Sequence, residues 1–329
     1  MPSRVTIEAL ADWLKAQDDI ALLGHVNPDG DVAGSCLALW HALRSLVKRA
    51  AVLLPGGPVK VYEGIIPGNE IALDPAEPLP FAPKAALAVD VSEPQRLGEA
   101  GLKLFEGCAA RAALDHHATN PGFGELYALD GEAAAAGELA VGLIDAMGVA
   151  LSREMVECLF VAISTDCGNF NFSNTRAGTL RAAARCIEAG ASVDELTRRL
   201  YRVRSLAETR LLGLILAGLE ISDDGRLAWS RLTRSMLAQA GADWSDNVNI
   251  VNYLLQIRGV CVAVLAEERG ERTTKLSLRS NPPFNVAARV AVPLGGGGHD
   301  CAAGATLELE LEPALRRVLA LAREALGAE

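Results

Sequence analysis

Imidazole and carboxylate side chains gather in the segment ALLGHVNPDGDVAGS, residues 21–35, in a combination that suits metal chemistry. An apolar run leads to His25, and Asp29 and Asp31 follow across a turn in which Gly30 can adopt a positive φ. Crowded carboxylates repel one another and lose hydration, so a divalent cation would stabilise the group. The alternative interpretation is a polar turn whose aspartates cap the next helix.

Three further apolar segments end in side chains of the same kinds. Asp90 follows one of them, Asp115, His116 and His117 follow the next, and Asp166 ends the third. Open α/β sheets bind their ligands at the carboxyl ends of strands, so we expect these side chains to converge on one rim of a sheet. Four of the five histidines lie in these segments or in a glycine-rich loop near the end of the chain, which argues against chance placement.

The residue types allow two cations to share one carboxylate. In this hypothesis one cation is bound by His25, Asp29 and Asp90, and the second by Asp31, Asp90, His116 and Asp166. Such a metal pair activates a bridging water and stabilises the attacking and leaving oxygens in phosphoryl transfer. Carboxylate and imidazole ligands without thiolate favour Mn²⁺, with Mg²⁺, Co²⁺ and Fe²⁺ as alternatives.

Four residues are candidates for a direct part in catalysis, namely His117, Asp31, Asp90 and Asp115. As an imidazolium, His117 could face a phosphate oxygen, while Asp115 could orient a neighbouring imidazole. A strand-end cap is an equal alternative for Asp115.

Alternating strand and helix patterns predict the scaffold that must position these residues. Apolar periodicity predicts helices at 5–16, 33–48, 95–105, 132–147, 153–163, 176–189 and 194–204, and strands at 20–23, 50–54, 85–91 and 111–117. The proline-rich passage 55–83 should be mostly loop. This alternation predicts an α/β fold with a doubly wound, mostly parallel sheet.

The pattern changes near Leu216, where two hairpins and interleaved helices predict a smaller α+β domain. This part carries the candidate substrate-binding residues Arg279, Ser280, Gly296, Gly297, Gly298 and His299. A glycine run exposes backbone N–H groups to an anion or a base, although a flexible turn is the alternative. We therefore predict residues 1–190 as the metal-binding domain, 191–215 as a helical linker and 216–329 as the substrate-binding domain.

Composition limits the partners and the compartment. A net charge of -10 and a pI near 5.1 argue against a long nucleic-acid duplex, which is bound through many Lys and Arg contacts. Seven cysteines without a CxxC pair and the lack of an apolar leader predict a cytoplasmic protein. The apolar blocks are too short for a membrane span, and the oligomeric state, including a homodimer, is left open.

The motifs GHVNPDGDVAGS, AVDVSE, LDHHATN and ISTDCGNFNFSNT resemble, in this order, the four signatures of the DHH phosphoesterases. SLRS followed by GGGGHDCAAG resembles their DHH-associated C-terminal domain. The resemblance extends from about residue 5 to about residue 310, and the chain's size is similar to the group that cleaves nanoRNA and 3'-phosphoadenosine 5'-phosphate (pAp).

The resemblance implies roles for single residues. The positions of His25, Asp29, Asp31, Asp90, His116 and Asp166 are metal ligands in this family, and the position of His117 contacts phosphate. The positions of Arg279 and His299 hold the phosphate or base of a nucleotide in this family. The implied substrates are short RNA or DNA oligonucleotides, pAp and linear dinucleotides such as pApA.

Two other functions stay open at this point. An inorganic pyrophosphatase or exopolyphosphatase would use the same metal site without recognising a base. A non-catalytic nucleotide receptor would be expected to lack some ligands, whereas every ligand position here is filled. An aromatic side chain near the site, such as Phe172 or Phe284, would favour a nucleotide because a base offers a stacking face, although both could be core residues. A metal-sensing or structural protein would leave Arg279 and the glycine loop unexplained.

Overall fold

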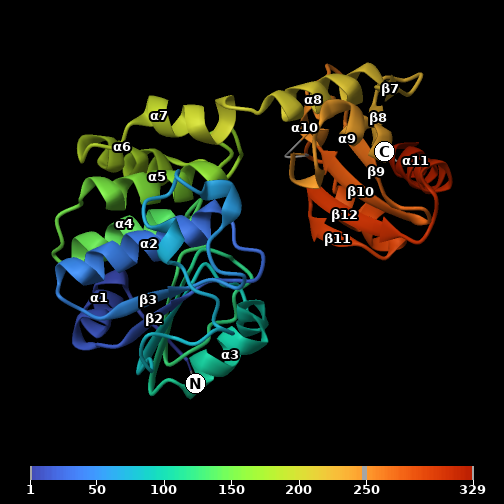
Figure 1. The fold of residues 1–329 in the computed structure, drawn as a ribbon. Helices are drawn as coiled ribbons and strands as arrows, with labels where there is room; N and C mark the ends of the chain where they lie inside the picture. The colour runs from blue at the N-terminus through green and yellow to red at the C-terminus, as the bar shows by residue number, and fades with distance from the viewer. Residues whose placement is uncertain (1, 247–249, 328–329) are drawn as a thin grey trace. The chain divides into compact units, whose positions relative to one another are not determined.

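The computed structural model describes residues 2–246 and 250–327, except for the side chains of Asp246 and His299. The chain divides into two compact units, Met1–Val203 and Arg204–Glu329 (Figure 1). Each unit has its own sheet and its own helices, and each is described separately below.

A six-stranded parallel sheet forms the centre of the first unit. Its strands are β1 (Ser3–Arg4), β2 (Ile20–Leu23), β3 (Ala50–Leu53), β4 (Ala85–Val89), β5 (Ala110–Asp115) and β6 (Leu126–Leu129). The strand order is β1-β6-β5-β4-β2-β3, and every pairing is parallel. The predicted α/β class with a mostly parallel sheet is confirmed, while β1 and β6 were not predicted.

Helices cover both faces of this sheet (Figure 1). They are α1 (Ile7–Ala16), α2 (Gly30–Ser45), α3 (Gly98–Gly107), α4 (Ala136–Ala146), α5 (Arg153–Asp166), α6 (Ala177–Glu188) and α7 (Val193–Thr197). Side chains alternate along a strand, so Ile20 and Leu22 of β2 face the core with α1, α2, α4 and α5. Ala21 and Leu23 face the opposite core, where α3 contributes Phe105.

The second unit holds a mixed six-stranded sheet. Its strands are β7 (Glu220–Ile221), β8 (Leu227–Leu232), β9 (Val262–Gly270), β10 (Thr273–Ser280), β11 (Gly297–His299) and β12 (Ala302–Leu307). Only the β8–β9 pairing is parallel among those of the described residues. The two predicted hairpins are therefore present as β7–β8 and β9–β10.

Helices also pack on both faces of the second sheet. They are α8 (Leu206–Ala217), α9 (Arg234–Ala240), α10 (Val251–Leu255) and α11 (Leu311–Gly327). Leu315 and Val318 of α11 share one core with Val264, whereas Leu211 of α8 and Leu254 of α10 share the other.

The seven cysteines are all free thiols. Of the helices in the described ranges, none combines the length and the apolar character that crossing a membrane requires.

Candidate active site

Three neighbouring strands deliver most of the candidate residues to one edge of the first sheet. His25 follows β2, Asp90 follows β4, and β5 ends at Asp115 with His116 and His117 directly after it. Since β2, β4 and β5 are adjacent and parallel, their carboxyl ends lie side by side. The predicted convergence of these five residues on one rim is therefore present in the structure.

Asp166 reaches the same region from a different kind of element. It is the last residue of helix α5, which agrees with the helix predicted at 153–163, so this carboxylate joins the others from the end of a helix and not from the end of a strand. Helix α5 packs extensively against α2, the helix that follows the His25 strand. The carboxylate therefore comes from the layer of helices that covers the sheet.

The Asp29–Asp31 turn combines a helix cap with a candidate ligand. Helix α2 begins at Gly30 rather than near Ala33, because Asp29 is its N-cap and accepts bonds from the backbone N–H groups of Asp31 and Val32 at 3.1 and 3.2 Å. The other oxygen of Asp29 lies 3.7 Å from Nε2 of His25. The capping interpretation and the ligand interpretation are therefore compatible for Asp29.

Gly30 is required because a side chain would not fit at this position, and not because the turn needs a positive φ there. A Cβ atom at this position would lie 2.4 Å from Oγ1 of Thr165 on α5. The residue of this turn that has a positive φ is Asn27, at 56°. The absence of a side chain at Gly30 therefore lets α2 approach the end of α5 that carries Asp166.

The first cluster of candidate ligands consists of His25, Asp29 and Asp90. Nε2 of His25 lies 3.7 Å from Asp29 and 3.6 Å from Oδ2 of Asp90. Nδ1 of His25 lies 2.9 Å from the carbonyl oxygen of Val26 and can donate to it. That bond would leave the lone pair of Nε2 directed at the two carboxylates, as a metal ligand requires.

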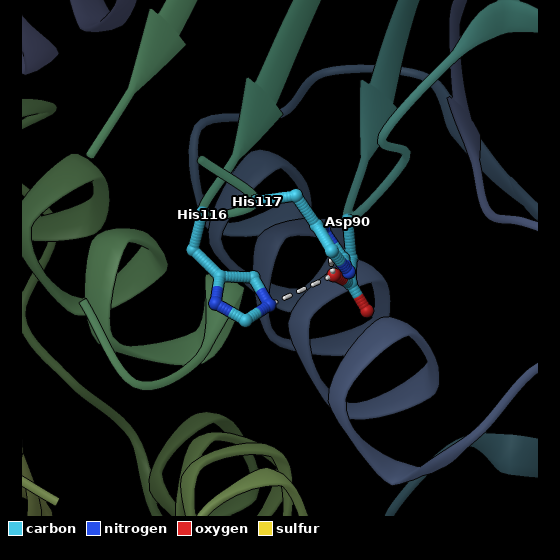
Figure 2. Close-up of side chains that lie close together, drawn as sticks. All are labelled: Asp90, His116 and His117. Atoms are coloured by element: carbon cyan, nitrogen blue, oxygen red, sulfur yellow. Dashed lines mark ion pairs between the residues drawn. The ribbon is translucent and has the colours of Figure 1, made fainter. Parts of the chain in front are cut away.

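The second cluster consists of Asp31, His116 and Asp166, with the other oxygen of Asp90 beside it. Nε2 of His116 lies 3.3 Å from Oδ1 of Asp90 (Figure 2) and 3.7 Å from both Asp31 and Asp166. Asp90 thus presents Oδ2 to His25 and Oδ1 to His116. One carboxylate joins the two clusters, in the geometry that a bridging ligand would have.

Three donors hold the carboxylate of Asp31. The backbone N–H groups of Ala136 and Gly137, at the start of α4, donate to it at 2.6 and 2.8 Å. The hydroxyl of Ser35 adds a bond of 3.0 Å. Nevertheless burial, with the charges of Asp90 and Asp166 adding to it, raises the pKa of Asp31 well above its usual value.

The neighbouring groups show how strongly the charges interact. Burial opposes charge on Asp90, but the imidazoles of His116 and His25, at 3.3 and 3.6 Å from its two oxygens, outweigh it and lower the pKa of Asp90. Burial raises the pKa of Asp166 to about 6. Burial alone would lower the pKa values of His25 and His116, yet the surrounding carboxylates raise both to about 10.

These residues fit divalent cations. Oδ1 of Asp90 is buried and makes no hydrogen bond, so it is a lone pair without a donor. The donors are carboxylate and imidazole, without a thiolate, as hard or borderline divalent cations prefer. Two cations would take over the positive charge that the two imidazoles otherwise supply to the four carboxylates.

His117 and Asp115 form a pair beside the two clusters. Nδ1 of His117 lies 2.8 Å from Oδ1 of Asp115 and 3.6 Å from Oδ1 of Asp90. Asp115 is almost fully buried, whereas about a third of the His117 side chain is exposed. Asp115 therefore contacts an imidazole in the way that the sequence suggested.

In the second unit, Arg279 and Ser280 end strand β10. Burial lowers the pKa of Arg279, and its guanidinium donates to the carbonyl of Leu278 at 2.9 Å. Ser280 is 3% exposed and donates its hydroxyl to the carbonyl of Phe284 at 2.6 Å. Against the expectation for Ser280, this hydroxyl is engaged in a turn and has almost no surface for a substrate.

The glycine run packs closely on β12. A Cβ on Gly296 would lie 2.1 Å from the carbonyl oxygen of Gly304, and one on Gly298 would lie 2.5 Å from that of Ala302. Gly297 has open space around it. The side chain of His299 lies outside what the structure describes, so its predicted contact with a nucleotide stays a prediction.

Sequence reasoning missed the groups that hold the candidate ligands in place. Ser35 lies one helical turn after Asp31, and this i to i+4 spacing could have identified it. No sequence pattern indicated the N–H groups of Ala136 and Gly137, because these residues are more than a hundred positions away from Asp31 in the chain. Asn120, which contacts Asp115, lies within the LDHHATN motif but was given no role.

Comparison with known proteins adds independent findings. Residues 19–163 match the model of the DHH family N-terminal domain, and residues 226–328 match that of the DHHA1 domain. The chain is 38% identical over 320 residues to the bifunctional oligoribonuclease and PAP phosphatase NrnA of Thermus thermophilus, covering 96% of this chain and 93% of that protein. It is 26% identical over 293 residues to NrnA of Bacillus subtilis, covering 88% and 90%.

One solved structure is similar to this chain over nearly its whole length. It is the crystal structure of an exopolyphosphatase-related protein from Bacteroides fragilis, with a TM-score of 0.86 and 26% identity. The match covers 98% of this chain and 95% of that one.

Proposed function

The chain belongs to the DHH family of phosphoester hydrolases, and we propose that it cleaves short oligonucleotides and linear dinucleotides, and dephosphorylates pAp, to release mononucleotides. Two relatives named as oligoribonuclease and PAP phosphatase support this substrate class. The observation that carries the proposal is the bridging position of Asp90, with one oxygen facing His25 and the other facing His116.

The candidate ligands would hold two divalent cations, of which Mn²⁺ suits the donor set best. His25 and Asp29 would serve one cation and Asp31, His116 and Asp166 the other, with Asp90 shared. When bound, such a pair lowers the pKa of a water and stabilises the attacking and leaving oxygens. The chain's own contribution is to keep these side chains in place, as α4 does for Asp31.

We assign the phosphate contact to His117. Its Nδ1 is engaged by Asp115 at 2.8 Å, which leaves Nε2 for a substrate oxygen. From the second unit we propose Arg279, the backbone of Gly297 and His299 as further contacts to the nucleotide. Their chemistry, a guanidinium, an open glycine and an imidazole, suits phosphate and base.

The test is a comparison of Asp90→Asn with Asp145→Asn, each with pAp, pApA, short RNA and pyrophosphate in Mn²⁺. Asp90→Asn removes the shared charge, and we expect a loss of several orders of magnitude in kcat on the nucleotide substrates. Asp145 of α4 forms a partly exposed ion pair with Arg185 of α6 and belongs to neither cluster, so its variant should keep wild-type activity. Full activity of Asp90→Asn would refute the proposed metal centre.

The same panel separates the alternatives. Faster hydrolysis of pyrophosphate than of any nucleotide would favour the pyrophosphatase or exopolyphosphatase function. Tight binding of pApA without turnover would favour a receptor. A cytoplasmic location is part of the proposal, supported by the seven free cysteines.

A further inference from the structure

The loop after β5 contains a buried asparagine whose amide makes three hydrogen bonds. Asn120 is 7% exposed, and its Nδ2 donates to Oδ2 of Asp115 at 2.6 Å and to the carbonyl of Val91 at 3.0 Å. Its Oδ1 accepts from the backbone N–H of Gly122 at 2.8 Å. The two N–H groups of one amide therefore connect the chain directly after Asp90 with the carboxylate at the end of β5.

The contact with Asp115 continues to His117. One oxygen of Asp115 accepts from Asn120 and the other lies 2.8 Å from Nδ1 of His117, so the carboxylate cannot rotate without losing a bond. The backbone N–H of Asn120 also donates to the carbonyl of His117 at 2.9 Å. Both the side chain and the backbone of His117 are thus restrained by this loop.

His117 has a competing acceptor. Its Nδ1 lies 3.6 Å from Oδ1 of Asp90, the buried oxygen without a hydrogen bond (Figure 2). If Asp115 were free to turn away, His117 could swing towards Asp90 and occupy an oxygen that the metal centre needs. The direction in which the His117 ring points therefore depends on whether Asp115 or Asp90 holds its Nδ1. Asn120 fixes the orientation of Asp115.

We propose that Asn120 is a positioning residue, which holds Asp115 so that it captures Nδ1 of His117 and leaves Nε2 for the phosphate of the substrate. The inference rests on the proposed function for the role of Nε2, but the arrangement of the three side chains can be measured without any substrate. An amide is required here, because a carboxylate in its place could donate nothing and would repel Asp115.

The experiment compares Asn120→Ala with Asn69→Ala. Asn69 is a buried asparagine of the same unit, 2% exposed, and its amide likewise joins two parts of the chain, through bonds of 3.1 Å to both backbone groups of Val59. We expect Asn120→Ala to lower kcat on a dinucleotide 10-fold to 100-fold, as loss of a group that orients an active residue typically does, with KM and Mn²⁺ affinity unchanged. Asn69→Ala should lose stability but keep kcat.

A double variant tests the route through His117. If Asn120 acts only by placing this ring, Asn120→Ala should lower kcat no further in a His117→Ala background. Additive losses would overturn the proposal, and so would a change in KM or in metal affinity without a change in kcat.

A spectroscopic measurement keeps the inference testable if no substrate is turned over or if Asn120→Ala is unstable. In protein with ¹⁵N-labelled histidine, the Nδ1–H resonance of His117, assigned with His117→Ala, should shift in Asn120→Asp and Asn120→Ser but not in Asn69→Ala. An unchanged resonance in a folded Asn120 variant would contradict the proposal, whereas absent turnover with a shifted resonance would contradict only the proposed function.

Discussion

At the scale of single residues, the backbone conformation of Asp90 decides how its carboxylate meets the two imidazoles. Asp90 has a φ of 58°, in the left-handed region that few residues other than glycine adopt. Which oxygen faces which imidazole depends on that conformation, and no local pattern of residues encodes it.

The two phenylalanines considered as stacking faces have different environments. Phe284 is 2% exposed in the core of the second unit, whereas Phe172 is 56% exposed. The ring of Phe172 lies against Gly168, where a Cβ would come within 2.5 Å of it. Its position six residues after Asp166 makes Phe172 the better candidate for contact with a base.

We predict that Phe172→Ala raises KM for pApA about 5-fold or more, since stacking on one base contributes roughly 1–3 kcal/mol. Pyrophosphate has no base, so its hydrolysis should not change. Leu180→Ala is the control, because Leu180 is similarly exposed at 53% and lies on α6. Steady-state kinetics on both substrates measure the effect, and an equal loss on pyrophosphate would contradict it.

Val47 has an unfavourable backbone conformation just after α2. It is 91% exposed and has a φ of 59°. Its backbone N–H donates to the carbonyl of Arg44, and the backbone N–H of Lys48 donates to the carbonyl of Leu43. These bonds end the helix in the way that usually requires glycine. A β-branched residue is strained in this conformation, and its side chain gains almost no burial in return.

Val47→Gly should therefore raise the free energy of unfolding by about 1 kcal/mol, the lower end of the cost of a left-handed conformation. Activity should not change. Lys48→Gly is the control, because Lys48 does not have a positive φ and glycine there should only destabilise. Urea unfolding of the three proteins measures the effect, and a less stable Val47→Gly variant would show that the valine has a contact of its own.

At the scale of elements, the parallel strands with long apolar runs were predictable and the others were not. Strand β6 has four residues and only Ala128 of them is buried, so it lacks a clear pattern. Helix α5 was predicted at 153–163, and it runs from Arg153 to Asp166, so the predicted helix stops three residues short of the carboxylate that it carries. It is buried on most sides, from Met155 to Ser164, and such a helix has no polar face to show on which side of the sheet it packs.

A buried carboxylate ties the starts of three strands. Asp19 precedes β2 and forms ion pairs with Arg49, before β3, and with Lys84, before β4, the latter at 2.8 Å. The hydrogen bond from Arg49 is the largest cause that lowers the pKa of Asp19, to about 2. Its pKa is thus below the unfolded value near 3.8, so the ionised group stabilises the fold above about pH 4.

Asp19→Asn should accordingly be less stable than the wild type at pH 7, and the difference should shrink as the pH falls from 4 towards 2. Protonation of Asp19 in the wild type removes the same charge that the variant lacks. Urea unfolding across this range measures it, with Asp12→Asn as the control, because Asp12 makes only an exposed pair with Lys15. A difference independent of pH would mean that Asp19 stabilises the fold through its shape instead of its charge.

At the scale of the whole molecule, the change of pattern near Leu216 indicated a second domain, but the ends of the two cores were not visible in the sequence. Leu196 of α7 belongs to a core of the first unit, whereas Leu211 and Ile215 of α8 belong to a core of the second. The predicted linker 191–215 thus contributes apolar residues to both units. Helical periodicity shows which face is buried, but not against which sheet.

The candidate ligands and the proposed nucleotide contacts lie in different units. All candidate ligands, from His25 to Asp166, lie within Met1–Val203, and this unit has its own hydrophobic cores. A protein that ends at Val203 should therefore fold and bind Mn²⁺ like the full chain. It should hydrolyse pApA at least 100-fold less efficiently, because it lacks Arg279 and the glycine run. Calorimetry with Mn²⁺ and kinetics with pApA measure both effects, with Arg279→Ala in the full chain expected to reproduce part of the kinetic loss. A folded 1–203 protein that binds no Mn²⁺ would mean that the first unit does not hold the metal centre alone, and undiminished cleavage of pApA would remove the second unit from substrate recognition.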